Sequence, residues 1–313
     1  MRSTVAALAA IAVSIAGLAA GRAHAEDMVI SQWGTSLSTG EFAVAMDEGF
    51  LKKHGAPVSG FVATGGGGTA VHAVVASELG YGLVSLAAAV DAIRHGIPIK
   101  IVNTETEYVD DDIVALKGSA IHSVADLKGK SLGIFSAGGA TDGYSALAIT
   151  KSGLKLTDVR RLAFSTTNGV MTALEKKVVP AVVMIEPFVT TSADKFQTVF
   201  VGHDLGAVVQ VVGIATDDMI KNHPDQLRAI LAARKEAVDA MKADPALAIR
   251  DIDHYYKTAP DAVIRKLLAN GFWSEGAIDI PAMERVVEGS RLIGVFKGKV
   301  DWSKAVDASF LPK

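Results

Sequence analysis

The sequence predicts an α/β protein of two lobes followed by a helical C-terminal region. Short apolar strands alternate with amphipathic helices from residue 28 to residue 104, a pattern typical of a mostly parallel sheet with crossover helices. The same alternation restarts after the segment 108–117, and from residue 218 onward the chain is almost purely helical. A chain of 313 residues, 50% of them hydrophobic, can form the large core that such a fold needs.

The N-terminus has the pattern of a cleavable secretory signal peptide. Arg2 precedes an uncharged, alanine-rich run at 5–20, and the small-residue sequence AHA follows at 23–25. The apolar run is short for a membrane span. We therefore expect cleavage after Ala25 and a freely soluble protein in the periplasm.

Charge and cysteine content exclude several classes of protein. Loss of residues 1–25 removes two of the 31 basic residues and none of the 34 acidic ones, which leaves a formal charge of −5. A surface of this charge does not attract nucleic acid. The chain has no cysteine, which excludes a disulfide framework and thiol catalysis.

In the first α/β unit, apolar segments bounded by turn residues predict strands, and apolar residues at helical spacing predict helices. The strands are expected at 28–33, 58–64, 81–86 and 97–104. The helices are expected at 40–52, 70–79 and 87–96, and the first of them is expected to close near Gly49 or Gly55.

In the second unit, a short capped helix and a strand are expected within 123–135, on either side of a turn at Gly129. Further strands are expected at 158–165 and 180–185, and helices at 141–153, at 168–177 and after Pro187. The acidic segment VDDD at 109–112 lacks the alternating ligand spacing of a calcium loop. It is expected to be an exposed connection between the lobes.

Four consecutive glycines stand between two threonines in the segment TGGGGT, residues 64–69. Glycine loses more backbone freedom on folding than any other residue, so such a run is unfavourable unless side chains must be absent. A strand is expected to end at Thr64 and a helix to begin near Thr69. Free N–H groups at a helix start bind anions or carbonyl oxygens, and glycines let a ligand approach the backbone. A tight turn without a ligand is the alternative, for which one or two glycines usually suffice.

The glycine run does not match a nucleotide-binding loop. A phosphate-binding P-loop continues with lysine and then serine or threonine, whereas Thr69 and Ala70 follow here. Gly65, Gly67 and Ala70 meet the dinucleotide fingerprint loosely. However, the strand after the next helix ends in Ser85 and not in the acidic residue that holds ribose. No cofactor is therefore expected.

A second loop of the same kind lies at 135–144, FSAGGATDGY, where a strand ends, small residues follow and a helix opens. Thr141 or Asp142 can cap that helix. A third loop, STTNG at 165–169, offers Asn168 as a cap or as a ligand contact. The first two loops come from different α/β units, so they can face each other across a cleft between the lobes.

Other strand ends carry polar or aromatic groups. Trp33 follows the first strand and can stack on a flat ligand or pack in the core. Glu186 stands between an apolar strand and Pro187, where its carboxylate can bind a ligand donor or cap the next helix. The remaining groups of this kind are Thr35, Ser85, Thr104, Thr106 and Glu107.

Patterns of catalytic and metal-binding residues are missing. The segment GYSAL at 143–147 lacks the final glycine of a nucleophile elbow, and there is no HExxH motif. The histidines outside the signal peptide are scattered, with no pair at metal-ligand spacing; they are His54, His72, His95, His122, His203, His223 and His254. We expect neither an enzyme nor a metal site.

Five segments resemble, in order, the periplasmic solute-binding proteins of ABC importers. The branch that they resemble binds nitrate, taurine and alkanesulfonates and includes binders of thiamine pyrimidine precursors. The most specific segment is SVADLKGKSLGI at 123–134. The others are FAVAMDEGFLKKHG at 42–55, GGGGTAVHAVVASELGYGLVS at 65–85, GLKLTDVRRL at 153–162 and TALEKKVVPAVVMIEPFV at 172–189. Tyr81 stands where this family often has aspartate.

The resemblance implies a type II periplasmic binding protein fold, with a ligand cleft between two lobes and two crossing strands at the hinge. After the signal peptide of residues 1–25, the first lobe would comprise residues 26–110 and 206–313, and the second lobe residues 111–205. It also implies an ABC permease and ATPase as partners of a monomeric protein. Together with the strand ends, it places in the cleft Trp33, Gly34, Thr35, Thr64, Gly65, Gly66, Gly67, Gly68, Thr69, Ser85, Thr106, Ser136, Gly138, Gly139, Thr141, Asp142, Asn168 and Glu186.

The expected function is the capture of a small anion for delivery to the permease. Sulfonates, taurine, nitrate and aromatic or organic carboxylates are the candidates, and a monoanion is favoured because these loops hold no lysine or arginine. A thiamine-precursor-like pyrimidine is the alternative, since Trp33 and Glu186 suit a planar ligand that donates hydrogen bonds. The alternative of another class is an enzyme on the same fold that acts on a pyrimidine or sulfur compound, with His72 and His122 as the nearest candidates.

Overall fold

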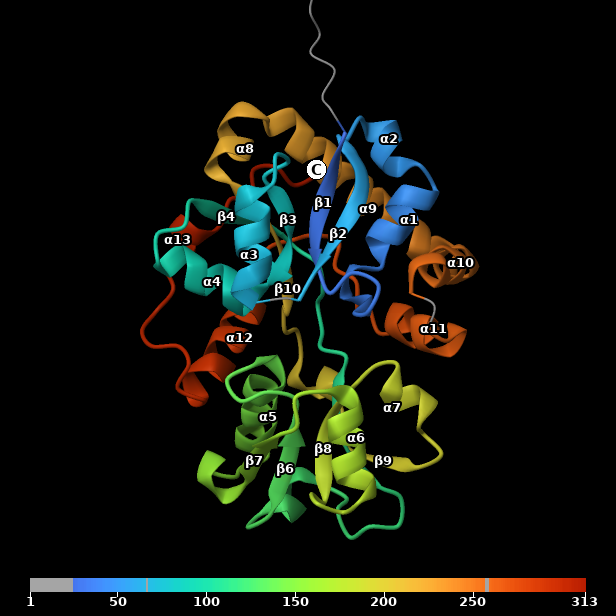
Figure 1. The fold of residues 1–313 in the computed structure, drawn as a ribbon, viewed down its shortest axis with the longest axis vertical. Helices are drawn as coiled ribbons and strands as arrows, with labels where there is room; N and C mark the ends of the chain where they lie inside the picture. The colour runs from blue at the N-terminus through green and yellow to red at the C-terminus, as the bar shows by residue number, and fades with distance from the viewer. Residues whose placement is uncertain (1–24, 66, 257–258) are drawn as a thin grey trace, which may run out of the picture.

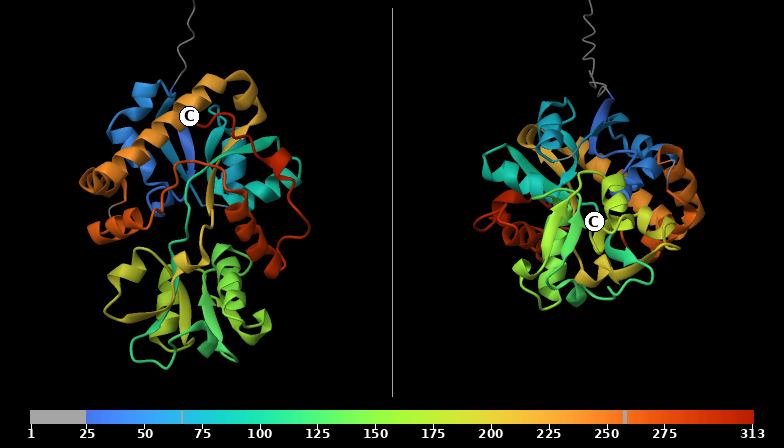
Figure 2. Two further views of the ribbon diagram at one scale, coloured as in Figure 1. Left: turned by 180° about the vertical axis from the view of Figure 1, so that it is seen from behind. Right: turned by 60° about the horizontal axis from the view of Figure 1, so that its bottom comes forward.

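The computed structural model describes residues 25–65, 67–256 and 259–313. These residues form two five-stranded sheets, each with helices on both faces (Figure 1). Two crossing segments, residues 105–110 and 201–210, connect the sheets, and Figure 2 shows them from behind. We call the first sheet with its helices lobe 1 and the second sheet with its helices lobe 2. The predicted fold class is confirmed.

The sheet of lobe 1 has the strand order β2-β1-β3-β10-β4. Strands β1, β2 and β3 are parallel, whereas β10 is antiparallel to both of its neighbours. Strand β10 follows the second crossing segment, so it returns the chain from lobe 2 to the middle of the first sheet. The strands are β1 (Glu26–Ser31), β2 (Val58–Thr64), β3 (Tyr81–Ser85), β4 (Ile99–Thr104) and β10 (Val211–Thr216).

The sheet of lobe 2 has the same plan, with the strand order β7-β6-β8-β5-β9. Strand β6 is parallel to β7 and β8, and β5, which follows the first crossing segment, is antiparallel to β8 and β9. The strands are β5 (Asp111–Leu116), β6 (Ser131–Ile134), β7 (Arg160–Ala163), β8 (Ala181–Ile185) and β9 (Phe196–Phe200).

Apolar clusters on both faces of each sheet hold the helices in place, because each helix buries one apolar face. In lobe 1, helices α1, α2, α9, α10 and α11 cover one face, and α3, α4 and α12 cover the other. In lobe 2, α5 covers one face and α6 and α7 cover the other. The helices before the second crossing segment are η1 (Leu37–Thr39), α1 (Glu41–Asp47), α2 (Phe50–His54), α3 (Gly67–Ala76), α4 (Leu86–Arg94), η2 (Val124–Leu127), α5 (Ala140–Lys151), η3 (Leu156–Asp158), α6 (Thr167–Glu175) and α7 (Phe188–Thr191).

The C-terminal region is helical, as the sequence predicts. Its elements are η4 (Gly202–Leu205), α8 (Asp217–Asn222), α9 (Pro224–Ala243), α10 (Pro245–Tyr255), α11 (Asp261–Ala269), α12 (Ile280–Leu292) and α13 (Trp302–Ala305). Among the described residues, no helix combines the length and apolar character needed to cross a membrane.

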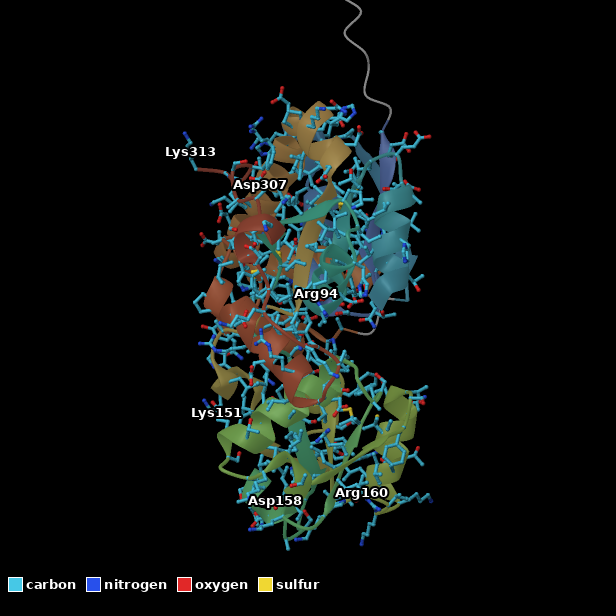
Figure 3. All side chains as sticks on the ribbon, turned by 90° about the vertical axis from the view of Figure 1, so that its left-hand side faces the viewer. Arg94, Lys151, Asp158, Arg160, Asp307 and Lys313 are labelled. Atoms are coloured by element: carbon cyan, nitrogen blue, oxygen red, sulfur yellow. The ribbon has the colours of Figure 1, made fainter. Side chains whose placement is uncertain are left out.

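Helix α12 leaves lobe 1 and packs on α5 of lobe 2, as the side view of Figure 3 shows. The two helices meet at glycines. A Cβ atom added to Gly289 would lie 2.9 Å from the carbonyl oxygen of Gly143, a distance that real Cβ atoms do not reach. The close approach of the two backbones therefore requires glycine at this crossing.

The structure corrects several local predictions. The helix expected at 40–52 is two helices, since Gly49 adopts a left-handed φ of 71° between them. Helix α3 begins at Gly67, one turn before its expected start at 70. Strands β9 and β10 were not expected. Within β10, Gly213 leaves room for the side chains of Asn103 and Tyr81, so the strand lacks a continuous apolar pattern.

The expectation that the segment 109–112 is an exposed connection is wrong. Val109, Asp111 and Asp112 are buried, and Asp111 opens strand β5. Asp111 accepts a hydrogen bond from Gln210 Nε2 at 3.1 Å, and Asp112 accepts one from the N–H of Gly202 at 2.9 Å. Polar partners in the second crossing segment therefore hold the acidic segment in place.

The predicted signal peptide, residues 1–25, lies outside the described residues apart from Ala25. The lobe boundaries expected at residues 26–110, 111–205 and 206–313 stay a prediction.

Candidate functional site

The predicted loops follow the carboxyl ends of the parallel strands in both lobes. In Figure 1, β1 and β2 run from the far end of lobe 1 toward lobe 2, and β6 runs from the far end of lobe 2 toward lobe 1. The carboxyl ends of the two parallel strand sets therefore face each other. Ligands of open α/β sheets bind beyond these ends.

The glycine loop of lobe 1 joins β2 to α3. Among its described glycines, Gly67 alone has a left-handed φ, of 60°. A Cβ atom added to Gly65, Gly67 or Gly68 would meet no other atom within 4 Å. The turn thus requires glycine at Gly67, while Gly65 and Gly68 leave open space that a side chain could fill. Gly66 lies outside the described residues.

The first N–H groups of α3 have no hydrogen-bond acceptor among the described residues. Gly67, Gly68 and Thr69 are exposed, and the first turn of the helix has no acidic residue. Their N–H groups donate no hydrogen bond to another described residue. The hydroxyl of Thr64, at the end of β2, is buried without a partner among the described residues. An anion or a carbonyl oxygen can satisfy such donors.

The loop at 136–142 in lobe 2 is closed by its own side chains. Asp142 accepts a hydrogen bond from the N–H of Gly138 at 2.9 Å and forms an ion pair with Arg161 of β7. The hydroxyl of Thr141 accepts from the N–H of Phe135 at 3.2 Å. Both side chains are buried, so they stabilise the loop. The sequence predicts the loop but not Arg161, which is 19 residues from Asp142 along the chain.

The other predicted residues of this loop lie at its surface. Ser136 and Gly138 are exposed, and Gly139 is the residue before α5. Gly138 has a left-handed φ of 75°. Their role as ligand contacts stays a prediction.

Helix α6 is the second helix whose first N–H groups have no acceptor among the described residues. Thr166 caps the helix, since its hydroxyl accepts from the N–H of Gly169 at 3.0 Å. The hypothesis that Asn168 caps the helix is therefore wrong. Asn168 is exposed, and neither its amide side chain nor the N–H groups of Thr167 and Asn168 bond to another described residue. Sequence analysis missed Thr166, although a threonine three residues before a helical glycine is a recognisable cap.

Trp33 packs in an aromatic cluster at the edge of lobe 1. Its ring centroid lies 4.3 Å from Phe61, 5.3 Å from Tyr255 and 5.1 Å from Tyr256. The side chain is partly exposed. Of its two neighbours, Gly34 has a left-handed φ of 76° and the exposed Thr35 donates its hydroxyl to the Gln32 carbonyl at 2.8 Å. Trp33 therefore serves packing, and stacking on a ligand stays a prediction.

Ser85 and Thr106 already have partners. Ser85 caps α4, where its hydroxyl accepts from the N–H of Ala88 at 3.4 Å. Thr106 is fully buried, and its hydroxyl accepts from the N–H of Gln210 at 3.4 Å. Thr106 thus joins the two crossing segments. Ligand contact by either hydroxyl stays a prediction.

Glu186 caps α7 and contacts lobe 1 at the same time. The carboxylate accepts hydrogen bonds from the N–H and the hydroxyl of Thr190, at 3.1 Å and 2.8 Å. Lys266 of α11 donates to Glu186 Oε1 at 2.6 Å. The hypothesis of a helix cap is confirmed. A ligand donor at Glu186 would have to displace Lys266, which the sequence separates from Glu186 by 80 residues.

The carboxyl groups near the crossing segments are difficult to ionise. Burial raises the pKa of Asp110 to about 7, and neighbouring carboxylates, Glu186 first among them, add to the rise. Burial also raises the pKa values of Asp111 and Asp112. Among the described residues, no group of His, Asp or Glu side chains is arranged to hold a metal ion.

A surface cavity of about 300 Å³ lies away from the predicted loops, among helices α9, α10 and α11. It is lined by Lys242, Pro245, Arg265, Leu268 and Ala269. None of the residues predicted to bind a ligand lines it, so the polar geometry of the loops is the better guide to the site.

Comparison with known proteins identifies the family and the fold. The family model described as NMT1/THI5 like matches residues 38–248. This match includes the glycine loop, all of lobe 2 and both crossing segments. No curated protein matches the sequence significantly.

Solved structures share the fold at low sequence identity. The periplasmic aliphatic sulphonate binding protein SsuA from Escherichia coli is 18% identical with a TM-score of 0.74, over 90% of this chain and 97% of that one. The alkanesulfonate-binding protein SsuA from Xanthomonas axonopodis pv. citri, bound to MOPS, is 17% identical with a TM-score of 0.71, over 90% and 98%. A cysteine-to-serine mutant of DszB in complex with biphenyl-2-sulfinic acid is 12% identical with a TM-score of 0.67, over 91% and 97%.

Proposed function

The chain belongs to the NMT1/THI5-like family, and from this premise we propose that it is the periplasmic solute-binding component of an ABC importer. A small anion binds between the lobes and favours a closed form, which the permease recognises. The alkanesulfonate-binding proteins of the same fold support this class of protein. The ligand has to be argued from this chain's own residues.

The observation that carries the proposal is the pair of open helix N-termini. In lobe 1 the N–H groups of Gly67, Gly68 and Thr69 have no partner among the described residues, and in lobe 2 the same holds for Thr167 and Asn168. Helices α3 and α6 both begin on the side of their lobe that faces the other lobe (Figure 1). The positive ends of two helix dipoles and bare backbone donors favour a negatively charged group between them.

A singly charged ligand suits these loops best. The segments 33–36, 64–69 and 165–168 contain no lysine or arginine. Arg161 and Lys266 contact predicted residues, and each of these cations is paired with a carboxylate. Backbone donors alone balance one negative charge more readily than two. We therefore place a sulfonate or carboxylate monoanion before a dianion.

Two alternatives make different demands on the site. A pyrimidine would use the partly exposed Trp33 and the free amide of Asn168. An enzyme would need a nucleophile or base near the loops. The chain has no cysteine, whereas the DszB relative was studied as a cysteine mutant. His72 and His122 are exposed and make no ion pair with another described residue. We propose a binding protein without catalytic activity.

Native mass spectrometry of the protein purified from a periplasmic fraction tests the proposal directly. The expected result is a polypeptide that begins at Glu26, with a co-purifying anion. Thermal shift with taurine, an alkanesulfonate, an aromatic carboxylate and a formyl-aminopyrimidine then ranks the ligand classes. A melting temperature raised only by the pyrimidine would rule out the anion. Conversion of a bound ligand to a product would show that the protein is an enzyme and would overturn this part of the proposal.

A further inference from the structure

Two elements of lobe 1 touch lobe 2 outside the crossing segments, on opposite sides of the molecule in Figure 1. On one side α12 packs on α5. On the other side α11 lies above α7, and Lys266 reaches from α11 to Glu186 at 2.6 Å. Among the ion pairs of the described residues, this pair is the one that joins the two lobes.

The Glu186 carboxylate is held in place for this contact by its own lobe. It is 4% exposed, and its two bonds with Thr190 fix both of its oxygens. Without Lys266 it would be a buried carboxylate with no cation, which is unfavourable. The Lys266 side chain is 39% exposed, so its ammonium stays hydrated when the lobes part. The pair is therefore partly shielded from water while the lobes are in contact, and it contributes more than a fully exposed surface pair does.

Two further carboxyl groups interact electrostatically with the Lys266 ammonium. Asp110 in the crossing segment and Asp112 in β5 both interact electrostatically with Lys266. Asp111 of β5 and Asp204 of η4 interact electrostatically with these two groups in turn. Burial raises the pKa values of Asp110, Asp111 and Asp112 and so favours their neutral forms, and Glu186 is the group of lobe 2 that Lys266 contacts directly.

We propose that Lys266 positions lobe 1 on lobe 2 through Glu186, as a latch that sets the ratio of open to closed molecules before any ligand binds. Removal of the ammonium leaves the crossing segments and the α12 contact in place, so the lobes part more often. The open-to-closed ratio rises about five-fold, which corresponds to about 1 kcal/mol. The latch rests on the proposed function only for its effect on affinity: an anion that needs the closed form binds the unlatched variant more weakly, by at most the same factor.

The cysteine-free chain allows the separation of the lobes to be measured directly. Glu78→Cys in lobe 1 and Lys176→Cys in lobe 2 replace exposed side chains that make no ion pair with another described residue. Spin labels at these two positions give the distance distribution between the lobes by double electron–electron resonance, without ligand. Lys266→Gln is expected to raise the ratio of the longer-distance to the shorter-distance population about five-fold. Glu186→Gln, which keeps an oxygen for Thr190, is expected to do the same.

Arg265→Gln is the matched control. Arg265 is adjacent to Lys266 on α11, is exposed and makes no ion pair with another described residue. The spin-labelled Arg265→Gln protein is expected to have the same distance distribution as the spin-labelled protein that keeps Arg265. If Lys266→Gln and Glu186→Gln both give this same distribution while melting cooperatively, the latch is overturned even if an anion binds. Shifted distances in a protein that binds none of the tested ligands would support the latch and count against the proposed function alone.

Discussion

Alanine substitutions at Gly67 and Gly68 are expected to have opposite effects on stability. At Gly68 the backbone is not left-handed and a Cβ meets nothing within 4 Å, so Gly68→Ala stabilises helix α3 by about 0.5–1 kcal/mol. At Gly67 the φ of 60° is left-handed, so Gly67→Ala destabilises the fold by about 1–2 kcal/mol. Near the midpoint, 1 kcal/mol shifts the melting temperature by about 2–4 °C in a domain of this order of size. The two variants should differ by several degrees in thermal denaturation.

The same variants separate a ligand-binding loop from a turn. If a ligand lies against the bare backbone at the start of α3, Gly68→Ala binds it more weakly although it is more stable, and Gly68→Val binds it at least about ten-fold more weakly. Isothermal titration with the anion identified by native mass spectrometry provides the affinities. Unchanged affinity in Gly68→Val, with a raised melting temperature in Gly68→Ala, would refute the binding role. The glycine at 68 would then have no explanation in this structure.

Three further predictions concern stability. Arg234 of α9 is buried and pairs with two buried carboxylates, Glu41 at 3.2 Å and Glu105 at 2.5 Å. Arg234→Met leaves both without their cation and lowers the free energy of unfolding by about 3–5 kcal/mol in urea denaturation. As a control, Lys235→Met at the next position removes a partly exposed ion pair with Asp239 and lowers the free energy of unfolding by less than about 1 kcal/mol. Burial raises the pKa of Asp110 to about 7, so the folded state favours its protonated form, and the stability present at low pH is lost as the pH rises through about 7. Between pH 5.5 and pH 8, the titration of Asp110 is expected to lower the free energy of unfolding by about 2 kcal/mol, and Asp110→Asn should remove this decrease. Thr166→Val removes the hydrogen bond to the N–H of Gly169 and lowers the free energy of unfolding by about 1 kcal/mol.

Each of these predictions has a result that would contradict it. An Arg234→Met protein as stable as Lys235→Met would show that the buried carboxylates are neutral without the cation. A pH dependence that is the same in Asp110→Asn as in the unmodified protein would place the titration on another residue. A Thr166→Val protein of unchanged stability would mean that water caps α6 equally well.

The sequence predicts the order of strands and helices well where the signal is local. Strand β2 matches its expected bounds, because its ends are marked by a proline at 57 and by the glycine run. The short helix at 124–127 has the capping box that its sequence contains, with Ser123 and Asp126 as partners. These features depend on residues within a few positions of one another.

Features that depend on distant pairings were missed. The segment 109–112 has the composition of a loop, and its burial results from contacts with Gly202 and Gln210, about a hundred residues away. Strand β10 contains a glycine because Tyr81 and Asn103 occupy the space of a side chain. For the same reason the cations beside Asp142 and Glu186 could not be found from the loops themselves.

The glycine crossing of α5 and α12 has a consequence for the mechanics of the protein. The two adjacent crossing segments alone would let one lobe both bend and twist relative to the other. The contact of Gly143 with Gly289 adds a second point of support, displaced to one side of these segments and closely packed. With the crossing segments as one support and this contact as the other, the easiest movement is a rotation about the line that joins them. Helix α12, near the C-terminus, thus restricts the direction in which lobe 2 can move.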